Sequence, residues 1–254
     1  MSTEPGTAAP VPLKGRTVLV AGAGSPSGTA VCKALEAAGA KVVAVGRDAA
    51  RLENTLFQLY DADLRTCDLS DAGEVAALAA DVQEIYGGID GLIHLVGGWR
   101  AGTGIGSQSE QDWDFLETNI LRTLRNVSRS FYDQLEASPG GRLAIVSSTA
   151  VESPTAAGAG YAAAKAAAEA WVRAIAAGFR GAQSGRKENS EPQRAAAVVF
   201  VVKALVDSAE RAAAPDRRFP GYTDVADLAA AVVRLFQQDA AEVNGQRIRL
   251  VPAT

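Results

Sequence analysis

Short apolar runs alternate along most of the chain with longer stretches that have the composition of helices. The apolar runs are rich in β-branched residues and end at glycine or polar residues, which is typical of buried strands. We therefore predict strands at Thr17–Ala21, Lys41–Val45, Leu64–Cys67, Gly91–Leu95, Gly141–Ser148, Ala195–Val202 and Gly245–Val251.

Helices are predicted between these strands. An alternation of strands and helices at this spacing indicates a parallel sheet with right-handed crossovers and helices on both faces. The fold class is therefore α/β, a doubly wound parallel sheet of about seven strands. The expected helices cover residues 29–38, 72–86, about 112–136, 160–180 and 225–238.

The 254 residues fit one large α/β domain, which we assign to residues 14–254. Residues 1–13 are expected to form a flexible tail. Residues 181–194 are polar and lack an apolar period, so we interpret them as a mobile surface loop within the domain and not as a linker.

Composition and charge narrow the range of partners. A content of 48% hydrophobic residues with a net charge of -4 suits a soluble globular protein and shows no basic bias toward nucleic acid or anionic membranes. We therefore expect small molecules or further copies of the chain as partners.

The cysteines and the first residues of the chain indicate in which cellular compartment the protein is expected. Cys32 and Cys67 lie in predicted regular structure and form neither a disulfide framework nor a metal cluster, so we expect buried thiols. The start of the chain has no basic region followed by an apolar run, and no apolar stretch approaches the roughly 18 residues of a membrane span. These features favour a cytoplasmic protein.

Candidate catalytic and ligand-binding residues lie where the predicted strands end. In a parallel sheet, ligands bind at the carboxyl ends of the strands. The turn Gly22–Gly28, Asp68, Gly97 and Ser148 all fall at those ends. We expect one ligand site along this edge.

The turn after the first strand, Gly22-Ala-Gly-Ser-Pro-Ser-Gly28, suits a phosphate group. Small residues let a diphosphate approach the backbone, and the following helix presents its positive end. Pro26 cannot donate a hydrogen bond, although Ser25 as a cap and Pro26 in the first turn suit a helix start. We predict that Gly22, Ser25, Ser27 and Gly28 hold a dinucleotide.

Gly46-Arg47-Asp48 after the second strand bears on the type of dinucleotide. A carboxylate at this strand tip would bind the ribose hydroxyls of NAD, whereas a small residue followed by arginine accommodates the 2′-phosphate of NADP. Gly46 and Arg47 favour NADP, with NAD left open because Asp48 is adjacent. A solvated arginine at the start of a loop is the alternative.

Tyr161 and Lys165 are four positions apart on a predicted helix and would share a face. A neighbouring cation lowers a tyrosine pKa from about 10 toward neutrality, which would allow Tyr161 to exchange a proton with a substrate. Ser148 across the same cleft could hold a carbonyl or alcohol oxygen. Alternatively, the pair are only neighbours on a helix surface.

These motifs together resemble the short-chain dehydrogenase/reductase family of single-domain Rossmann-fold oxidoreductases. The resemblance runs from about Lys14 to the end of the chain. Ser148 lies thirteen residues before the Tyr161-x-x-x-Lys165 pair, and Leu116-Glu-Thr-Asn119 matches the family's asparagine.

The resemblance implies a role for each matching residue. Tyr161 would be the general acid/base, Lys165 would lower its pKa and bind the nicotinamide ribose, and Ser148 would position the substrate oxygen. Asn119 would hold a water linking Lys165 to solvent. The implied cofactor site also includes Asp68, Leu69, Val96 and Gly97, and the implied assembly is a homo-oligomer, a tetramer or dimer.

Three motifs depart from the family pattern. Pro26 replaces a glycine, His94-Leu-Val-Gly97 replaces Asn-Asn-Ala-Gly, and Lys203-Ala204 replaces Pro-Gly near the expected nicotinamide. The main hypothesis is an NAD(P)-dependent oxidoreductase that interconverts a carbonyl and an alcohol. The alternative is a non-catalytic nucleotide-binding or regulatory protein with the same fold.

The remaining candidates are single residues. His94 has no second histidine to share a metal, so we expect a packed, hydrogen-bonded core residue and no metal site. Trp99 could line a substrate pocket, and Arg100 is expected to be exposed at its rim. Trp113 and Trp171 are expected to pack in the core or between subunits. Residues 203–222 should cover the substrate pocket.

Overall fold

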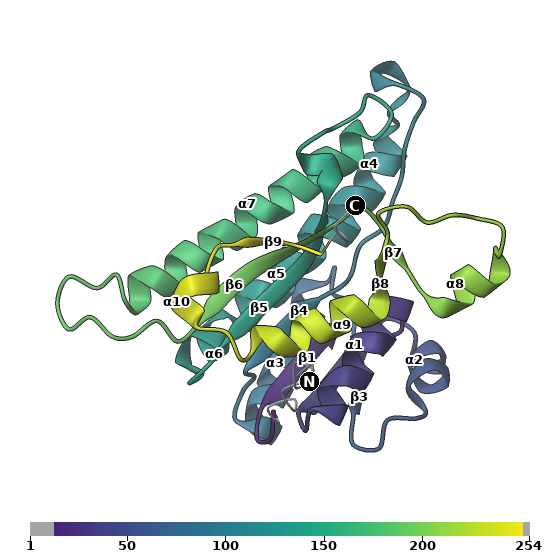
Figure 1. Ribbon diagram of the computed structural model, residues 1–254. Coiled ribbons are helices and arrows are strands. Elements are labelled where there is room, and N and C mark those ends of the chain that lie inside the picture. The colour runs from purple at the N-terminus through teal and green to yellow at the C-terminus, as the bar shows by residue number, and fades with distance from the viewer. Residues whose placement is uncertain (1–12, 251–254) are drawn as a thin grey trace, which may run out of the picture.

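The structure is a computed structural model and describes residues 13–250. Its main sheet has seven parallel strands in the order β3-β2-β1-β4-β5-β6-β9, which confirms the predicted doubly wound α/β fold (Figure 1). The strands are β1 (Thr17–Ala21), β2 (Lys41–Gly46), β3 (Asp63–Thr66), β4 (Gly91–His94), β5 (Arg142–Ser148), β6 (Ala196–Val202) and β9 (Arg247–Arg249).

Helices cover both faces of this sheet because its strands are apolar on both faces. In β1, Leu19 and Ala21 pack in one core cluster, whereas Val18 and Val20 pack in the other. The first face is covered by α3 (Ala72–Tyr86), α5 (Thr123–Ser130), α6 (Tyr132–Ala137) and α7 (Ala159–Ala182), and the second by α1 (Pro26–Ala37), α2 (Ala49–Leu56), α9 (Val225–Leu235) and α10 (Ala240–Val243).

The predicted helix 112–136 is helical in the structure except at Phe131, but it is not one regular α-helix. The segment consists of α4 (Glu110–Leu116), a π-helical stretch (Glu117–Arg122), α5 and α6. A π-helical stretch widens the helix and often marks a functional site. Here it carries Asn119, whose side-chain amide donates to the Phe115 carbonyl at 2.8 Å.

Two regions contain elements that the sequence pattern did not predict. The helix α2 follows β2, and the segment after β6 forms a separate two-stranded parallel sheet of β7 (Leu205–Val206) and β8 (Thr223–Asp224) with α8 (Ser208–Ala213) between them. The α8 segment projects from the body of the protein beside the carboxyl ends of the strands (Figure 1). Short 3₁₀ turns lie at Ile105–Ser107 and Thr149–Val151.

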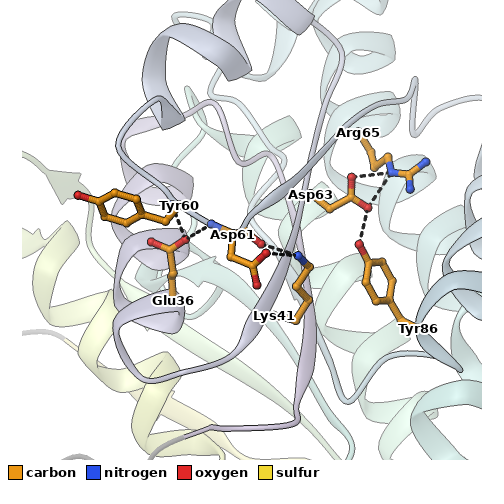
Figure 2. Close-up of polar contacts among 7 residues, drawn as sticks. All are labelled: Glu36, Lys41, Tyr60, Asp61, Asp63, Arg65 and Tyr86. Carbon is orange, nitrogen blue, oxygen red and sulfur yellow. Dashed lines mark hydrogen bonds and ion pairs between the residues drawn. The ribbon is translucent and has the colours of Figure 1, made fainter.

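At one edge of the sheet, β3 is held by charged and phenolic groups (Figure 2). The Asp63 carboxylate accepts hydrogen bonds from Arg65 at 2.9 Å and from the Tyr86 hydroxyl at 3.0 Å. Lys41 donates to Asp61 at 2.7 Å. Charged groups of this kind discourage pairing of an open edge strand with another chain.

The loop predicted at 181–194 is fixed at its base by Gln183, which is 1% exposed. The Gln183 side-chain oxygen accepts from the backbone of Arg194 and Ala195 at 2.8 and 3.0 Å. The mobility of the residues between these anchors stays a prediction. Leu13, which the sequence placed in the N-terminal tail, is buried, and the rest of that tail lies outside the described residues.

Candidate active site

Two adjoining cavities lie at the carboxyl ends of the strands, where the sequence predicted a ligand site. The larger has a volume of about 1330 Å³ and the smaller about 360 Å³. Their linings share Ser25, Leu95, Val96 and Gly97, so the two spaces meet between the glycine turn and the end of β4. An elongated ligand with two ends can therefore occupy both.

Ser148, Tyr161 and Lys165 line the larger cavity. Ser148 stands at the end of β5, where its hydroxyl accepts a hydrogen bond from the Ala150 backbone at 3.1 Å. The adjacent hydroxyl of Ser147 instead donates to the buried Glu169 at 2.6 Å. The Ser147 hydroxyl is thus used within the protein interior, whereas the Ser148 hydroxyl forms the hydrogen bond that lowers the pKa of Tyr161.

Lys165 is 8% exposed and donates to the Val146 carbonyl at 2.7 Å. Its Nζ lies 5.9 Å from the centroid of the Tyr161 ring, so the helix α7 brings the two groups together as its spacing predicted. Burial lowers the pKa of Lys165 to about 8, while the negative charge of Glu169 acts in the opposite direction. Lys165 therefore remains mostly protonated at neutral pH, although it loses its proton more easily than an exposed lysine does.

The expectation that Lys165 lowers the Tyr161 pKa is corrected by the structure. Burial raises the pKa of the Tyr161 phenol above its ordinary value, and the Ser148 hydroxyl only partly offsets this effect. The physical reason is that removal of water disfavours the charged phenolate. Tyr161 is accordingly a phenol at neutral pH and can donate a proton.

Asn119 lines the smaller cavity and is absent from the described lining of the larger one. Its backbone carbonyl accepts from the Thr123 hydroxyl at 2.9 Å. The structure therefore brings three of the four predicted catalytic residues to one cavity and places the fourth in the adjoining one. A water between Asn119 and Lys165 stays a prediction.

His94 is a packed, hydrogen-bonded core residue, as the sequence predicted. It is 3% exposed, and its Nε2 lies 3.1 Å from the Thr123 hydroxyl. Burial, reinforced by the charge of Lys165, lowers the pKa of His94 to about 3. Within residues 13–250, no group of three or more His, Cys, Asp and Glu side chains is placed to hold a metal ion.

The glycine turn packs tightly against the first turn of α1, which leaves no room for side chains at Gly28. Gly22 has a φ of 87°, and a β-carbon at Gly28 would lie 2.2 Å from the Gly22 carbonyl oxygen. Ser25 caps α1 by accepting from the Gly28 backbone at 3.0 Å, and Pro26 occupies the first turn, which confirms the predicted helix start. Ser25 and Ser27 also line the larger cavity. These features fit an anionic diphosphate at the positive end of α1.

Arg47 lines the smaller cavity at the end of β2. The carboxylate of the neighbouring Asp48 accepts from the Arg51 backbone at 3.0 Å and thereby caps α2. A second cation, Arg51, lines the same cavity and donates from Nε to the Gly24 carbonyl at 2.8 Å. The sequence pattern did not reveal Arg51 because it did not reveal α2, although Asp48 as a helix cap indicates the start of that helix.

The other predicted dinucleotide contacts line the smaller cavity or its junction with the larger one. Hydrogen bonds from Ser70 hold the pKa of Asp68 below its ordinary value, and the charge of Arg47 contributes in the same direction. Arg47 and Asp68 therefore face a common space. The lining also includes Gly22, Ser25, Leu69, Val96 and Gly97.

The tryptophans differ in their surroundings. Trp99 lines the larger cavity and is 65% exposed, as expected for a residue at the rim of that cavity. Trp171 packs against the core and donates to the Ser128 hydroxyl at 2.9 Å, whereas Trp113 remains 41% exposed. Arg100 lies 3.8 Å from the centroid of the Phe115 ring and so packs against the protein at that rim.

Comparison with known proteins agrees with this geometry. Residues 16–183 match the sequence model of the short chain dehydrogenases. The chain is 32% identical over 143 residues to an uncharacterized oxidoreductase of Staphylococcus aureus strain MW2, a match that covers 55% of this chain and 62% of the relative. The chain thus aligns with about three-fifths of the length of that curated relative.

Solved structures share the fold over almost the whole chain. A short chain dehydrogenase from Shigella flexneri superposes with a TM-score of 0.81 at 20% identity, covering 95% of this chain and 92% of that one. A gluconate 5-dehydrogenase from Burkholderia cenocepacia, solved with NADP and tartrate, gives 0.76 at 21% identity, with coverage of 95% and 96%. Among residues 13–250, no helix is both long and apolar enough to cross a membrane.

Proposed function

Because the chain belongs to the short-chain dehydrogenase family, we propose that it is an NAD(P)-dependent oxidoreductase that interconverts a carbonyl and an alcohol. One observation carries this proposal. Ser148, Tyr161 and Lys165 line a single cavity that continues past Gly97 to the glycine turn. Proton-transfer groups thus adjoin a site suited to a dinucleotide.

The residues of the chain suit distinct tasks. Ser148 holds the substrate oxygen by a hydrogen bond, and Tyr161 gives that oxygen a proton during reduction or removes one during oxidation. Lys165, held by the Val146 carbonyl, supplies positive charge beside the phenol. A bound nicotinamide would supply the hydride acceptor or donor at the substrate carbon.

NADP is the proposed cofactor in preference to NAD. Arg47 and Arg51 both line the smaller cavity, and the nearby Asp48 carboxylate is engaged in capping α2. A 2′-phosphate would therefore meet two cations, while the carboxylate that could favour a free ribose hydroxyl is occupied. This arrangement supports a charge-assisted interaction with phosphate.

A fluorescence titration with NADPH and NADH tests the proposal most directly. We expect saturable binding of both, with NADPH the tighter ligand, followed by turnover of a carbonyl or alcohol in a substrate panel. Absence of binding to both cofactors would refute the oxidoreductase proposal. Binding without turnover of any panel member would instead favour the alternative, a non-catalytic nucleotide-binding protein.

Self-association is part of the same proposal. Trp113 on α4 is 41% exposed, which leaves an aromatic surface beside the site that a second copy of the chain could cover. Light scattering coupled to size-exclusion chromatography should report a dimer or tetramer. A monomer at all protein concentrations would contradict this part of the proposal.

A further inference from the structure

We propose that the substrate of this site carries an anionic group, a carboxylate or a phosphate, which is bound by Lys203 and Arg217 in the lining of the larger cavity. The proposal rests on the oxidoreductase function proposed above and adds the chemical class of the substrate. The anionic group itself is not altered, because the reaction takes place at the carbon and oxygen near Ser148 and Tyr161.

The charges around the larger cavity are strongly unbalanced. Four cationic side chains line it, whereas Glu152 is the one carboxylate in its described lining. The protein as a whole has a net charge of -4, so this concentration of positive charge is local. The cations are Lys165, Lys203, Arg217 and Arg249.

Two of these four cations already have partners within the protein. The Glu152 carboxylate pairs with both Arg247 and Arg249, which neutralises it and occupies Arg249. Lys165 is buried beside Tyr161 and donates to Val146. An entering anion therefore meets no free carboxylate in the described lining, and Lys203 and Arg217 remain available to bind it.

Lys203 and Arg217 converge on one phenol. Arg217 donates to the Tyr222 hydroxyl at 3.1 Å, and the Lys203 Nζ lies 6.0 Å from the centroid of the Tyr222 ring. Arg217 also lies 4.8 Å from the centroid of Phe219. These contacts bring both cations beside Tyr222, which itself lines the cavity, so one anion can meet both of them.

The partners of the two cations leave them accessible. Among the described residues, Lys203 forms no ion pair with a carboxylate, and its Nζ donates to the Pro220 carbonyl at 3.0 Å. Arg217 approaches Glu210 at 3.4 Å, but both side chains are about half exposed. An exposed pair of this kind contributes little, so a ligand anion can compete for the guanidinium.

The segment that carries these groups is anchored to the body of the protein. The Thr223 backbone donates to the Ala204 carbonyl at 2.9 Å, and its hydroxyl donates to Leu250 at 2.8 Å. This closes the base of the segment that contains α8 in Figure 1. Lys203 and Tyr222 are consequently held at the cavity wall from both ends of the segment.

The dinucleotide diphosphate is the competing source of negative charge. It is expected near Ser25 and Ser27, which also line the larger cavity. If Lys203 and Arg217 bound the diphosphate, their removal would weaken the binding of NADPH itself. If they bind the substrate, their removal would weaken the binding of a separate anion to the NADPH-loaded protein.

The test uses succinate, inorganic phosphate and the neutral analogue succinamide, each titrated into NADPH-saturated protein at constant ionic strength and followed by NADPH fluorescence and calorimetry. We expect succinate or phosphate to bind at least about tenfold more tightly than succinamide, since each charge-assisted hydrogen bond contributes about that factor. The stronger of the two anions identifies the carboxylate or the phosphate class.

Variants locate the bound anion. Lys203→Gln and Arg217→Gln should each weaken anion binding about tenfold without changing the affinity for NADPH. Arg218 is exposed and outside the cavity lining, so the matched control Arg218→Gln should change neither affinity. No saturable anion binding, equal binding of succinamide, or an equal effect of Arg218→Gln would overturn the proposal. Weakened NADPH binding in the variants would assign the cations to the diphosphate.

Calorimetry with cofactor-free protein separates this proposal from the oxidoreductase function. If the protein binds neither NADPH nor NADH, the oxidoreductase proposal fails. Anion binding that depends on Lys203 and Arg217 but not on Arg218 would still support the anionic site in that case. Loss of that dependence in protein that does bind NADPH would reject the anionic site alone.

Discussion

His94 donates a hydrogen bond from Nε2 to the Thr123 hydroxyl, with a distance of 3.1 Å between the two atoms. The direction follows from a second hydrogen bond, in which the Thr123 hydroxyl donates its single hydrogen to the Asn119 carbonyl at 2.9 Å. Thr123 must therefore accept from the imidazole, which carries its hydrogen on Nε2. The end of β4 is thereby tied to the π-helical stretch that carries Asn119.

This relationship predicts a pH-dependent stability. The pKa of His94 falls to about 3 in the folded protein, against about 6.5 when it is unfolded. The unfolded chain thus binds the extra proton between these values, and stability must fall as pH falls through that window. Between pH 7 and 5 the protein should lose about 2 kcal/mol through this residue.

The variant His94→Gln isolates that contribution, because the chain contains one histidine and a glutamine amide can still donate to Thr123 from the position of the imidazole Nε2. Denaturant unfolding of both proteins at pH 7 and 5 is the measurement. Carboxylates affect both proteins alike and cancel in the comparison. An equal loss of stability in the two proteins would show that His94 is not held in its neutral form.

Tyr161→Phe should bind NADPH as the unchanged protein does and lose turnover by about 10²–10⁴-fold, the usual contribution of a general acid or base. The ring still fills its place against the core, so the unfolding midpoint should hardly change. Steady-state rates and the fluorescence titration are measured on the same preparation. Retained turnover would remove Tyr161 as the proton donor.

The raised pKa of Tyr161 predicts different pH profiles for the two directions of reaction. Reduction needs the phenol, so its rate should stay constant from neutral pH upward until the phenol ionises. Oxidation needs the phenolate, so its rate should rise about tenfold per pH unit over the same range. Rates of both directions across pH 6–10 test this, and an oxidation rate independent of pH would contradict the assignment.

Arg47→Gln should weaken NADPH by about tenfold or more and leave NADH nearly unchanged, because only NADPH carries the 2′-phosphate. Arg47 lines the smaller cavity. Lys33→Gln provides a control, since Lys33 is exposed on α1 and outside both cavities. Equal losses for the two cofactors would mean that Arg47 does not recognise the phosphate.

Gly28→Ala should destabilise the fold and abolish tight dinucleotide binding. The added β-carbon would lie 2.2 Å from the Gly22 carbonyl oxygen, so the backbone of the turn must move, at a cost of about 1–3 kcal/mol. Gly106→Ala is the matched control, because a β-carbon there meets no atom within 4 Å. Thermal unfolding and NADPH titration should separate the two variants clearly.

The sequence predicted the fold because buried parallel strands leave a strong local signal. The runs Val18–Ala21 and Ala195–Val202 are apolar without interruption, as expected for strands covered on both faces. The signal was weaker where the chain lies at the surface. The polar eight-residue helix α2 and the short strands β7 and β8 lack a long apolar period, so the pattern did not distinguish them from loops.

The candidate site was predictable to the extent that it depends on spacing. The separation of Tyr161 and Lys165 places both on one face of α7, and Ser148 follows from the end of its strand. Arg51 was missed, since its approach to Gly24 depends on a helix that the pattern did not reveal. Lys203 and Arg217 come together at Tyr222 only because a two-stranded sheet closes the segment between them.

The order of residues along the chain determined the alternating elements, the glycine turn and the pairing of a phenol with an amine on one helix. Tertiary structure alone decided the ionisation of these groups. Burial raised the Tyr161 pKa where the sequence predicted a lower one, and burial also keeps His94 neutral. The reason is that spacing specifies which groups are neighbours, whereas the exclusion of water that governs their charge depends on every element packed around them.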